Sequence, residues 1–330
     1  MSNLSNKIIG GVFWTTLETI INRSLGFIIQ MVLARLLFPA DFGLVGMAVV
    51  FITFVAVFND LGMNAALIQK KEDKLTPLHY DTAFWTGLVW SVFLYIFIFF
   101  VLTPISVSFY QEDALTLIMP ILSVGVLLSP INLVHRAQLI KSMNFKKLAI
   151  VNNISSFVSG GVALTLAFLD FGVWALVFYS ISRTLVAIPL LFRATKWRPN
   201  WRWDKEIFKE FFSFGAYTTG TSLANKLTGN LDFILVGKLI GTAGLGLYSF
   251  AFMLTNVLRD HIVSIVNKVI YPVYASLQDD RDKMAVMFLK VISMNNLIVY
   301  PVVLGVFLFV EDFLPLFFGE KWNDSVPIIK

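Results

Sequence analysis

The chain alternates long apolar runs with short polar gaps. A helix that crosses a lipid bilayer needs roughly 20 mostly apolar residues. We expect such helices at residues 8–37, 42–67, 82–110, 114–135, 148–169, 172–192, 207–240, 243–270 and 284–310. Residues 313–330 are expected to form an interfacial turn and the start of a further helix. The pattern predicts an all-α polytopic membrane protein with about nine or ten transmembrane helices.

The polar gaps differ in charge from one to the next. The basic gaps hold Lys70, Lys71, Lys74, Arg136, Lys141, Lys146, Lys147, Arg193, Lys196, Arg198, Arg202, Lys205, Arg281 and Lys283. The gaps between them hold Asp41, Glu112, Asp113, Asp170, Glu311 and Asp312. Because basic loops stay in the cytoplasm, this alternation predicts a cytoplasmic amino terminus. The first run has no small-residue cleavage site, so we expect it to remain as a membrane helix.

Composition supports a membrane protein and excludes several function classes. Of the 330 residues, 57% are hydrophobic and 14% are charged, against roughly 25% charged in soluble domains. The net charge of +5 lies in the loops, so we expect no nucleic-acid partner, although residues 197–203 mix Trp with Arg. The chain has no Cys and three scattered His, which predicts no metal site. Known catalytic motifs are absent from the sequence, and we do not expect an enzyme.

An internal repeat divides the chain into two related parts. An offset of 203 residues pairs Asn22 with Asn225 and Arg23 with Lys226, among other matches. Six helices separate the two copies, so both have the same orientation, which makes the repeat parallel. We expect an amino-terminal lobe of six helices at residues 1–199 and a carboxy-terminal lobe at residues 200–330. The second lobe would be incomplete, with three to four helices.

Each copy of the repeat carries polar residues on one face of a helix. These residues are Glu18, Asn22, Arg23 and Gln30 in the first copy and Thr221, Asn225, Lys226 and Asp232 in the second. A basic residue facing lipid at mid-membrane costs at least ~2.5–3.5 kcal/mol, so both faces must meet protein or water. Two interpretations stay open. Neighbouring opposite charges neutralise each other inside a packed bundle, or both faces line a cationic cavity between the lobes that binds an anion such as phosphate.

In the cavity interpretation, Arg23 and Lys226 form the cationic centre and Glu18, Asn22, Gln30, Thr221, Asn225 and Asp232 line the wall. Arg183, in the middle of the sixth predicted helix, lines the same cavity or makes a buried structural pair.

Three segments resemble a known family. They are Leu36–Gly46 (LLFPADFGLVG), its second-half counterpart Leu239–Ser249 (LIGTAGLGLYS) and residues 136–148, which end in Asn-Phe-Lys-Lys-Leu. All three resemble the polysaccharide transporter family, the Wzx-type flippases of the MOP superfamily, and within it the colanic or teichuronic acid exporter-like subgroup. The family pattern continues beyond the length of this chain, and we expect the chain to be truncated at its carboxyl end.

The resemblance implies a two-lobed MOP/MATE-like bundle in the bacterial cytoplasmic membrane. Its substrate would be an undecaprenyl-pyrophosphate-linked oligosaccharide, flipped to the outer leaflet by alternating access for surface polysaccharide biosynthesis. Partners would be this lipid-linked substrate, membrane lipids and the polysaccharide polymerase machinery. No cofactor is implied beyond coupling to Na⁺ or H⁺. The family's cationic cavity maps onto Arg23, Lys226 and Arg183.

Other functions remain as alternatives. A cation-coupled multidrug exporter of the MATE type shares the architecture, but its cationic substrates favour carboxylates in the cavity. A non-transport component of polysaccharide assembly, such as a membrane glycosyltransferase, would need large catalytic external loops, and the loops here are short. A purely structural scaffold leaves the repeated polar face unexplained.

Overall fold

The structure is a computed structural model that describes residues 2–71, 74–276 and 280–330, without side chains for residues 2–8, 213, 214, 216–218, 257–276, 281 and 298. Every regular element in these ranges is a helix, which confirms the predicted fold class. The first predicted lobe contains α1 (Ser2–Leu36), α2 (Pro39–Ala56), η1 (Val57–Asn59), α3 (Met63–Gln69), α4 (Pro77–Phe97), η3 (Ile98–Leu102), α5 (Thr103–Tyr110), α6 (Leu115–Lys141), α7 (Phe145–Phe168) and α8 (Val173–Thr195). After it come α9 (Lys205–Thr228), α10 (Leu231–Ser276), α11 (Arg281–Phe318), η4 (Glu320–Ser325) and α12 (Val326–Ile329).

Eight helical segments of the described chain are long and apolar enough to cross a membrane. Six of them correspond to the first six predicted helices, and the last corresponds to the ninth. Between them, Thr219–Asn256 is a single candidate membrane helix where the sequence predicts two, at residues 207–240 and 243–270. Many side chains of this region lie outside the described residues. The chain is therefore a multi-pass membrane protein.

Three predicted helices are interrupted. The second breaks at Leu61 and Gly62, whose φ angles of 45° and 73° are left-handed, a conformation that glycine adopts without strain. The third contains the π turn η3 just before Pro104, because proline lacks the N–H that would continue the α-helical ladder. The seventh ends at Thr228 instead of residue 240, and α10 then kinks at Gly241 with φ 82°.

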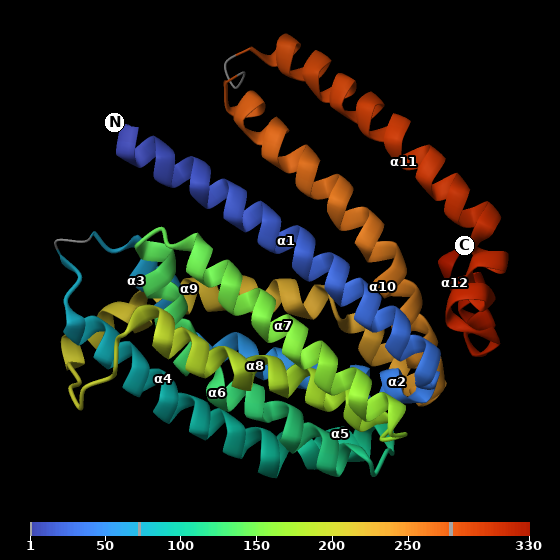
Figure 1. Cartoon of the computed structure of the whole chain (residues 1–330), viewed down its shortest axis with the longest axis horizontal. Coiled ribbons are helices and arrows are strands. Elements are labelled where there is room, and N and C mark those ends of the chain that lie inside the picture. The colour runs from blue at the N-terminus through green and yellow to red at the C-terminus, as the bar shows by residue number, and fades with distance from the viewer. Residues whose placement is uncertain (1, 72–73, 277–279) are drawn as a thin grey trace. The chain divides into compact units, whose positions relative to one another are not determined.

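The chain forms two compact units, residues 1–245 and 246–330. In the first unit, α1 packs along α7, α7 along α8, and α6 against both α4 and α8 (Figure 1). Ile29, Leu33, Ala163 and Ala175 form part of its core. These two units are defined by contacts between residues, whereas the lobes 1–199 and 200–330 were predicted from the sequence repeat. The lobes therefore stay a prediction.

The second unit has its own small core. Phe250 stacks on Trp322 with ring centroids 4.0 Å apart and meets the edge of Phe318 at 4.8 Å. Both Trp322 and Phe318 are fully buried. The Ser325 hydroxyl donates to the Leu247 carbonyl at 3.2 Å, which attaches η4 to α10.

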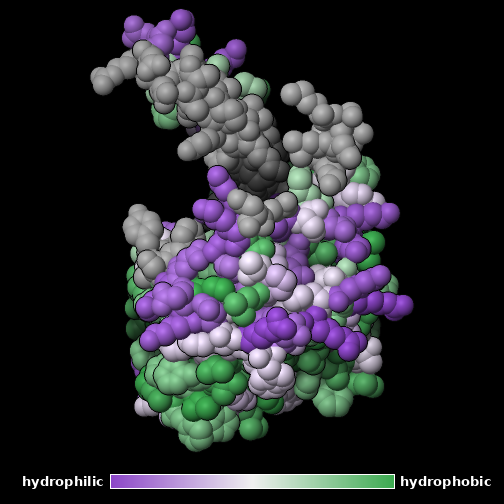
Figure 2. All heavy atoms as spheres, turned by 90° about the vertical axis from the view of Figure 1, so that its left-hand side faces the viewer, coloured by the Kyte–Doolittle hydropathy of each residue, from purple (hydrophilic) through white to green (hydrophobic). Residues whose placement is uncertain are grey.

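The basic gaps of the first unit lie together at one end of its helices. Lys141 Nζ donates to the Ile68 carbonyl at 3.0 Å, and Lys147 Nζ donates to the Ala194 carbonyl at 2.9 Å. Figure 2 faces this end and shows hydrophilic side chains gathered across it. At the opposite end, Lys238 donates to the Phe109 carbonyl. The basic and the acidic loops of the first unit thus lie at opposite ends of its helices. Their assignment to the two sides of a membrane remains a prediction.

Two basic residues predicted to lie in the connection after the fourth helix are in fact helical. Arg136 and Lys141 belong to α6, which extends six residues past the predicted end at His135, and only Ser142–Asn144 connect it to α7. Within the helix, both side chains have acceptors on neighbouring elements: Asn152 for Arg136 and the Ile68 carbonyl for Lys141. The loop prediction was wrong here because it treated a basic residue as the end of a helix.

Candidate functional site

The polar face of α1 meets a polar face of α7. Asn22 Nδ2 donates to Asn153 Oδ1 at 2.5 Å, and the Ser156 hydroxyl donates to Asn22 Oδ1. One turn earlier on α1, Glu18 Oε1 accepts from Asn152 Nδ2 at 2.5 Å. Asn152 and Ser156 are buried, and Glu18, Asn22 and Asn153 are half-buried. These side chains therefore satisfy one another between helices that are otherwise apolar.

A third helix adds a positive charge to this network. The Arg136 guanidinium of α6 donates to Asn152 Oδ1, so Asn152 connects Arg136 to Glu18. Arg136 is also within electrostatic range of both Glu18 and Arg183 of α8. The group thus brings together two guanidinium groups and one carboxylate from α1, α6 and α8. We call the residues Glu18, Asn22, Arg136, Asn152, Asn153, Ser156 and Arg183 the α1–α7 cluster.

Small residues on α7 allow α1 to approach closely enough for these bonds. The buried face of α7 carries Asn152, Ser156, Ser159, Gly160 and Ala163, at the spacing of successive helical turns. A Cβ on Gly160 would lie 2.2 Å from Ile29 Cδ1, so any larger residue would require the end of the Ile29 side chain to move. Small residues at such interfaces let two membrane helices pack with their backbones close together.

The structure places the predicted site residues in two groups. On α1 and α8, Glu18, Asn22 and Arg183 belong to the α1–α7 cluster, and the Arg183 side chain is exposed. Arg23 is also exposed, and Gln30 is half-buried. On the second copy, Thr221, Asn225 and Lys226 are exposed on α9, and Asp232 is half-buried in the first turn of α10. The helix α9 packs against α2, α3 and α4, whereas the polar bonds of Glu18 and Asn22 run to α7. A common cavity lined by both copies therefore stays a prediction.

Sequence reasoning missed Arg136, Asn152, Asn153 and Ser156. Arg136 was assigned to a loop, and the neutral side chains of the fifth predicted helix were read as part of an apolar span. The signal that identifies them is the stripe of Asn, Ser and Gly along that helix, since polar and small residues in a membrane helix mark the face that contacts another helix.

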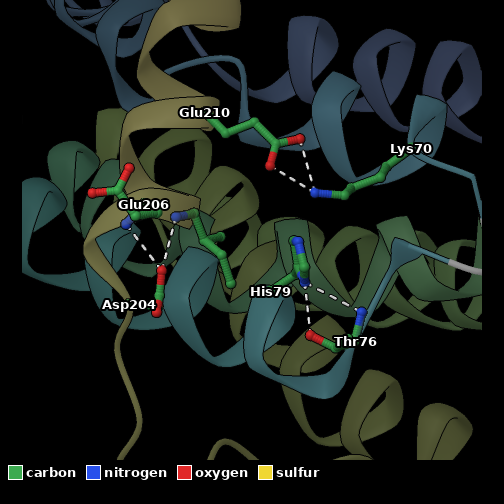
Figure 3. Close-up of polar contacts among 7 residues, drawn as sticks. Lys70, Thr76, His79, Asp204, Glu206 and Glu210 are labelled. Carbon is green, nitrogen blue, oxygen red and sulfur yellow. Dashed lines mark hydrogen bonds and ion pairs between the residues drawn. The ribbon is translucent and has the colours of Figure 1, made fainter.

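The connection from α8 to α9 is fixed at the basic end of the first unit. Asp204 Oδ1 accepts from the backbone N–H groups of Glu206 and Ile207 at 2.9 and 3.0 Å, which caps the start of α9. One turn along α9, Glu210 pairs with Lys70 at 2.6 Å, and Figure 3 shows these two side chains pointing toward each other beside His79 and Thr76. The Lys70–Glu210 pair holds the first turns of α9 against the end of α3, and the Asp204 N–H donates to the Thr82 hydroxyl of α4 at 3.2 Å.

Within the ranges described, no three His, Cys, Asp or Glu side chains gather as metal ligands would. The Arg, Glu, Asn and Ser side chains of the α1–α7 cluster act through charge and hydrogen bonding. A pair of guanidinium groups with one carboxylate leaves a formal surplus of one positive charge, which suits an anionic group such as a phosphate.

Solved structures with a similar fold are transporters. The chain superposes on an inward-facing multidrug resistance MATE family transporter of the MOP superfamily with a TM-score of 0.67 at 15% identity, covering 94% of this chain and 78% of that one. An outward-facing MATE family transporter gives a TM-score of 0.54 at 16% identity, with 97% and 76% covered. These likenesses establish the fold of the MOP superfamily.

Relatives by sequence act in polysaccharide biosynthesis, according to their names. The chain is 30% identical to the teichuronic acid biosynthesis protein TuaB of Bacillus subtilis (strain 168), covering 100% of this chain and 68% of that protein. It is 28% identical to the lipopolysaccharide biosynthesis protein WzxC of Escherichia coli (strain K12), covering 99% and 66%. The succinoglycan biosynthesis transport protein ExoT of Rhizobium meliloti (strain 1021) is 24% identical, with 96% and 64% covered. The chain spans about two thirds of the length of these relatives.

A family model described as "Polysaccharide biosynthesis protein" matches residues 32–327, nearly the whole chain. The match includes α7 and α8, all of α6 and the last turn of α1. Together with the fold, this confirms the resemblance to Wzx-type transporters that the sequence motifs indicated. The chain belongs to the polysaccharide biosynthesis protein family, within the MOP superfamily of membrane transporters.

Proposed function

We propose that this protein flips a lipid-linked oligosaccharide across the bacterial cytoplasmic membrane for the synthesis of a surface polysaccharide. The substrate would carry its sugar on undecaprenyl pyrophosphate. The names of TuaB, WzxC and ExoT support a role in polysaccharide synthesis, and membership of the family supports a role in transport. Such a transfer between leaflets makes and breaks no covalent bond, so we propose that the protein is not an enzyme.

The observation that carries this proposal is the charge of the α1–α7 cluster. Arg136 and Arg183 lie within electrostatic range of each other, and Glu18 is the carboxylate beside them. Bringing a second guanidinium near a half-buried one costs energy unless an anion offsets it. A pyrophosphate has the charge to do so, and arginine binds phosphate oxygens in a fork geometry.

We extend this proposal to the cationic residues on the predicted polar faces. The pyrophosphate would be bound in turn, as the lobes rock, by Arg183 of the cluster, by Arg23 on α1 and by Lys226 on α9. The amino terminus would be cytoplasmic, so the basic end of the first unit would receive the substrate. We further propose that an inward gradient of Na⁺ or H⁺ drives the cycle.

The test is made in a strain of the source bacterium that lacks the gene. We expect loss of the surface polysaccharide and accumulation of its lipid-linked repeat unit, measured by mass spectrometry of extracted lipids. The full-length gene should restore export, and its Arg183→Gln variant should not, because that change removes one of the two guanidinium groups. Arg193→Gln is the matched control: Arg193 lies on the same helix α8 and is also exposed, but it is placed in the last turn of the helix.

Arg23→Gln and Lys226→Gln extend the test to α1 and α9. Normal export by Arg183→Gln, with protein levels equal to those of the control, would contradict the role of the cluster. A deletion strain that neither loses polysaccharide nor accumulates a lipid-linked precursor would contradict the function itself.

Multidrug export is the alternative that the fold leaves open, because the similar solved structures are MATE family transporters. A site for cations needs a carboxylate that is available to the ligand. Glu18 Oε1 instead accepts from Asn152, and the carboxylate lies in the field of Arg136. We therefore expect no change in sensitivity to cationic drugs in the deletion strain, and a clear increase would favour the alternative.

A further inference from the structure

A large apolar pocket lies outside the α1–α7 cluster, at the basic end of the first unit. Its volume is about 780 Å³, within the range of roughly 300–1,000 Å³ usual for ligand sites. One wall is α4, the opposite wall is the start of α9, and the connection before α9 forms the rim. The lining residues are Leu61, Trp85, Thr86, Val89, Trp90, Phe93, Trp201, Arg202, Trp203, Phe208 and Phe212.

Ring stacking and hydrogen bonds hold the aromatic side chains of the pocket in place. Trp85 stacks on Trp201 with ring centroids 3.9 Å apart, and its indole N–H donates to the Asn200 carbonyl at 2.7 Å. The Trp203 indole donates to the Thr86 hydroxyl at 3.0 Å, and the Trp90 indole donates to the Phe58 carbonyl at 2.8 Å. The indole N–H groups of Trp85, Trp90 and Trp203 are therefore already engaged, and these rings offer the pocket mainly carbon.

This chemistry distinguishes between possible occupants. A sugar or another polar body would lose its bonds to water and find few replacements on these walls. A hydrocarbon chain would gain from every CH₂ that leaves water, about 0.8 kcal/mol each. The interior of the pocket therefore fits an apolar chain.

The rim has a different character. Arg202 is the charged residue among those lining the pocket, and its side chain is exposed. Lys196 and Arg198 lie on the same connection, Lys205 is the first residue of α9, and Trp201 is 85% exposed. Tryptophan and basic residues concentrate at the headgroup level of membranes, where they meet lipid phosphates.

We propose that this pocket binds one anionic membrane phospholipid, with an acyl chain between α4 and α9 and the phosphate at Arg202. The apolar interior, the basic rim and the position at the end of membrane-spanning helices all match the two halves of such a lipid. Because the pocket is walled by both α4 and α9, a bound lipid would link the start of α9 to the first six helices. This site rests on the membrane fold and not on the substrate proposed above.

The experiment measures the unfolding temperature of the purified full-length protein in detergent with added lipid. We expect phosphatidylglycerol to stabilise the wild type more than phosphatidylcholine does. Arg202→Gln should bind phosphatidylglycerol roughly fivefold more weakly, the loss expected for one basic residue near a phosphate. Arg198→Gln, on the same connection but outside the lining, should keep the wild-type preference.

A second pair of variants tests the interior. Val89 is 70% exposed and lines the pocket, so Val89→Trp fills it without removing a packing contact, and we expect the lipid effect to disappear. Val92→Trp, on the same helix but outside the lining, is its control. An unchanged preference in both Arg202→Gln and Val89→Trp would overturn the proposal.

A further measurement uses the wild type alone, so it does not depend on how the variants fold. Phosphatidylglycerol with brominated acyl chains should quench tryptophan fluorescence more than brominated phosphatidylcholine, because four Trp line the pocket. Equal quenching by the two lipids would contradict a specific site. Equal stabilisation by inorganic phosphate, or displacement of the brominated lipid by a lower concentration of undecaprenyl phosphate, would assign the pocket to another ligand and overturn the proposal.

Discussion

The polar faces of α1 and α9 share a sequence pattern but have different surroundings. Asn22 of α1 is half-buried and bonded to Asn153 and Ser156 of α7, whereas its counterpart Asn225 of α9 is exposed. A repeated pattern therefore predicts a repeated helix, while the role of each polar side chain depends on the helix that covers it.

The largest effect should come from breaking the charge pairing of the covered face. We expect Glu18→Leu to destabilise the protein by about 3 kcal/mol, because it leaves the buried Asn152 Nδ2 without its carboxylate acceptor and removes the negative charge near Arg136. The measurement is the free energy of unfolding in mixed detergent micelles. The double variant Glu18→Leu with Arg136→Met should recover most of the loss, and no recovery would show that the two residues act independently.

The next effect compares the repeat pair directly. Asn22→Leu removes the partner of Asn153 and Ser156 and should cost about 2 kcal/mol, since buried polar groups would lose their hydrogen bonds. Asn225→Leu changes an exposed position and should stay within about 0.5 kcal/mol of the wild type. The same unfolding assay measures both, and equal losses would mean that α9 has a covering partner as α1 has.

A smaller effect tests how closely α1 and α7 approach. Gly160→Ala places a methyl group against Ile29, whereas the next residue, Gly161, has open space around its position. We expect Gly160→Ala to be less stable than Gly161→Ala by about 1 kcal/mol, because only the end of the Ile29 side chain must move. Using the neighbouring glycine as reference removes the common gain in helix propensity. Identical stabilities would indicate that α1 and α7 separate easily.

The smallest effect concerns an exposed charge in the second unit. Asp280 caps α11, and its hydrogen bonds to the side chain and the N–H of Lys283 hold the pKa of Asp280 below its ordinary value. Because the pKa of Asp280 is lower in the folded state, the ionised carboxylate stabilises the fold at pH values above the ordinary pKa of 3.8. This stabilisation is lost as the pH falls through the folded pKa. Faster amide exchange at the start of α11 below about pH 4 should reveal it. Asp280→Asn should show no such pH dependence.

Much of the fold was predictable from the sequence, and the site was predictable only in part. The apolar runs gave the helices, and the polar face of α1 identified Glu18 and Asn22. Arg136 was misplaced because the positive-inside rule reads charge along the chain and cannot detect an acceptor on another helix. The interruptions at Leu61–Gly62 and at Gly229–Asn230 also escaped, since a few polar residues within a long apolar run do not by themselves mark the end of a helix.

The sequence by itself determined that the chain is a row of membrane helices with a duplicated polar face. It could do so because a helix satisfies its backbone bonds locally, and its preference for lipid is a property of contiguous residues. Only the tertiary structure decided that α7 covers α1, that Arg136 joins them, and that α4 and α9 enclose an aromatic pocket. Those contacts join residues as far apart as Asn22 and Asn153, 131 positions along the chain, and depend on which helix faces meet.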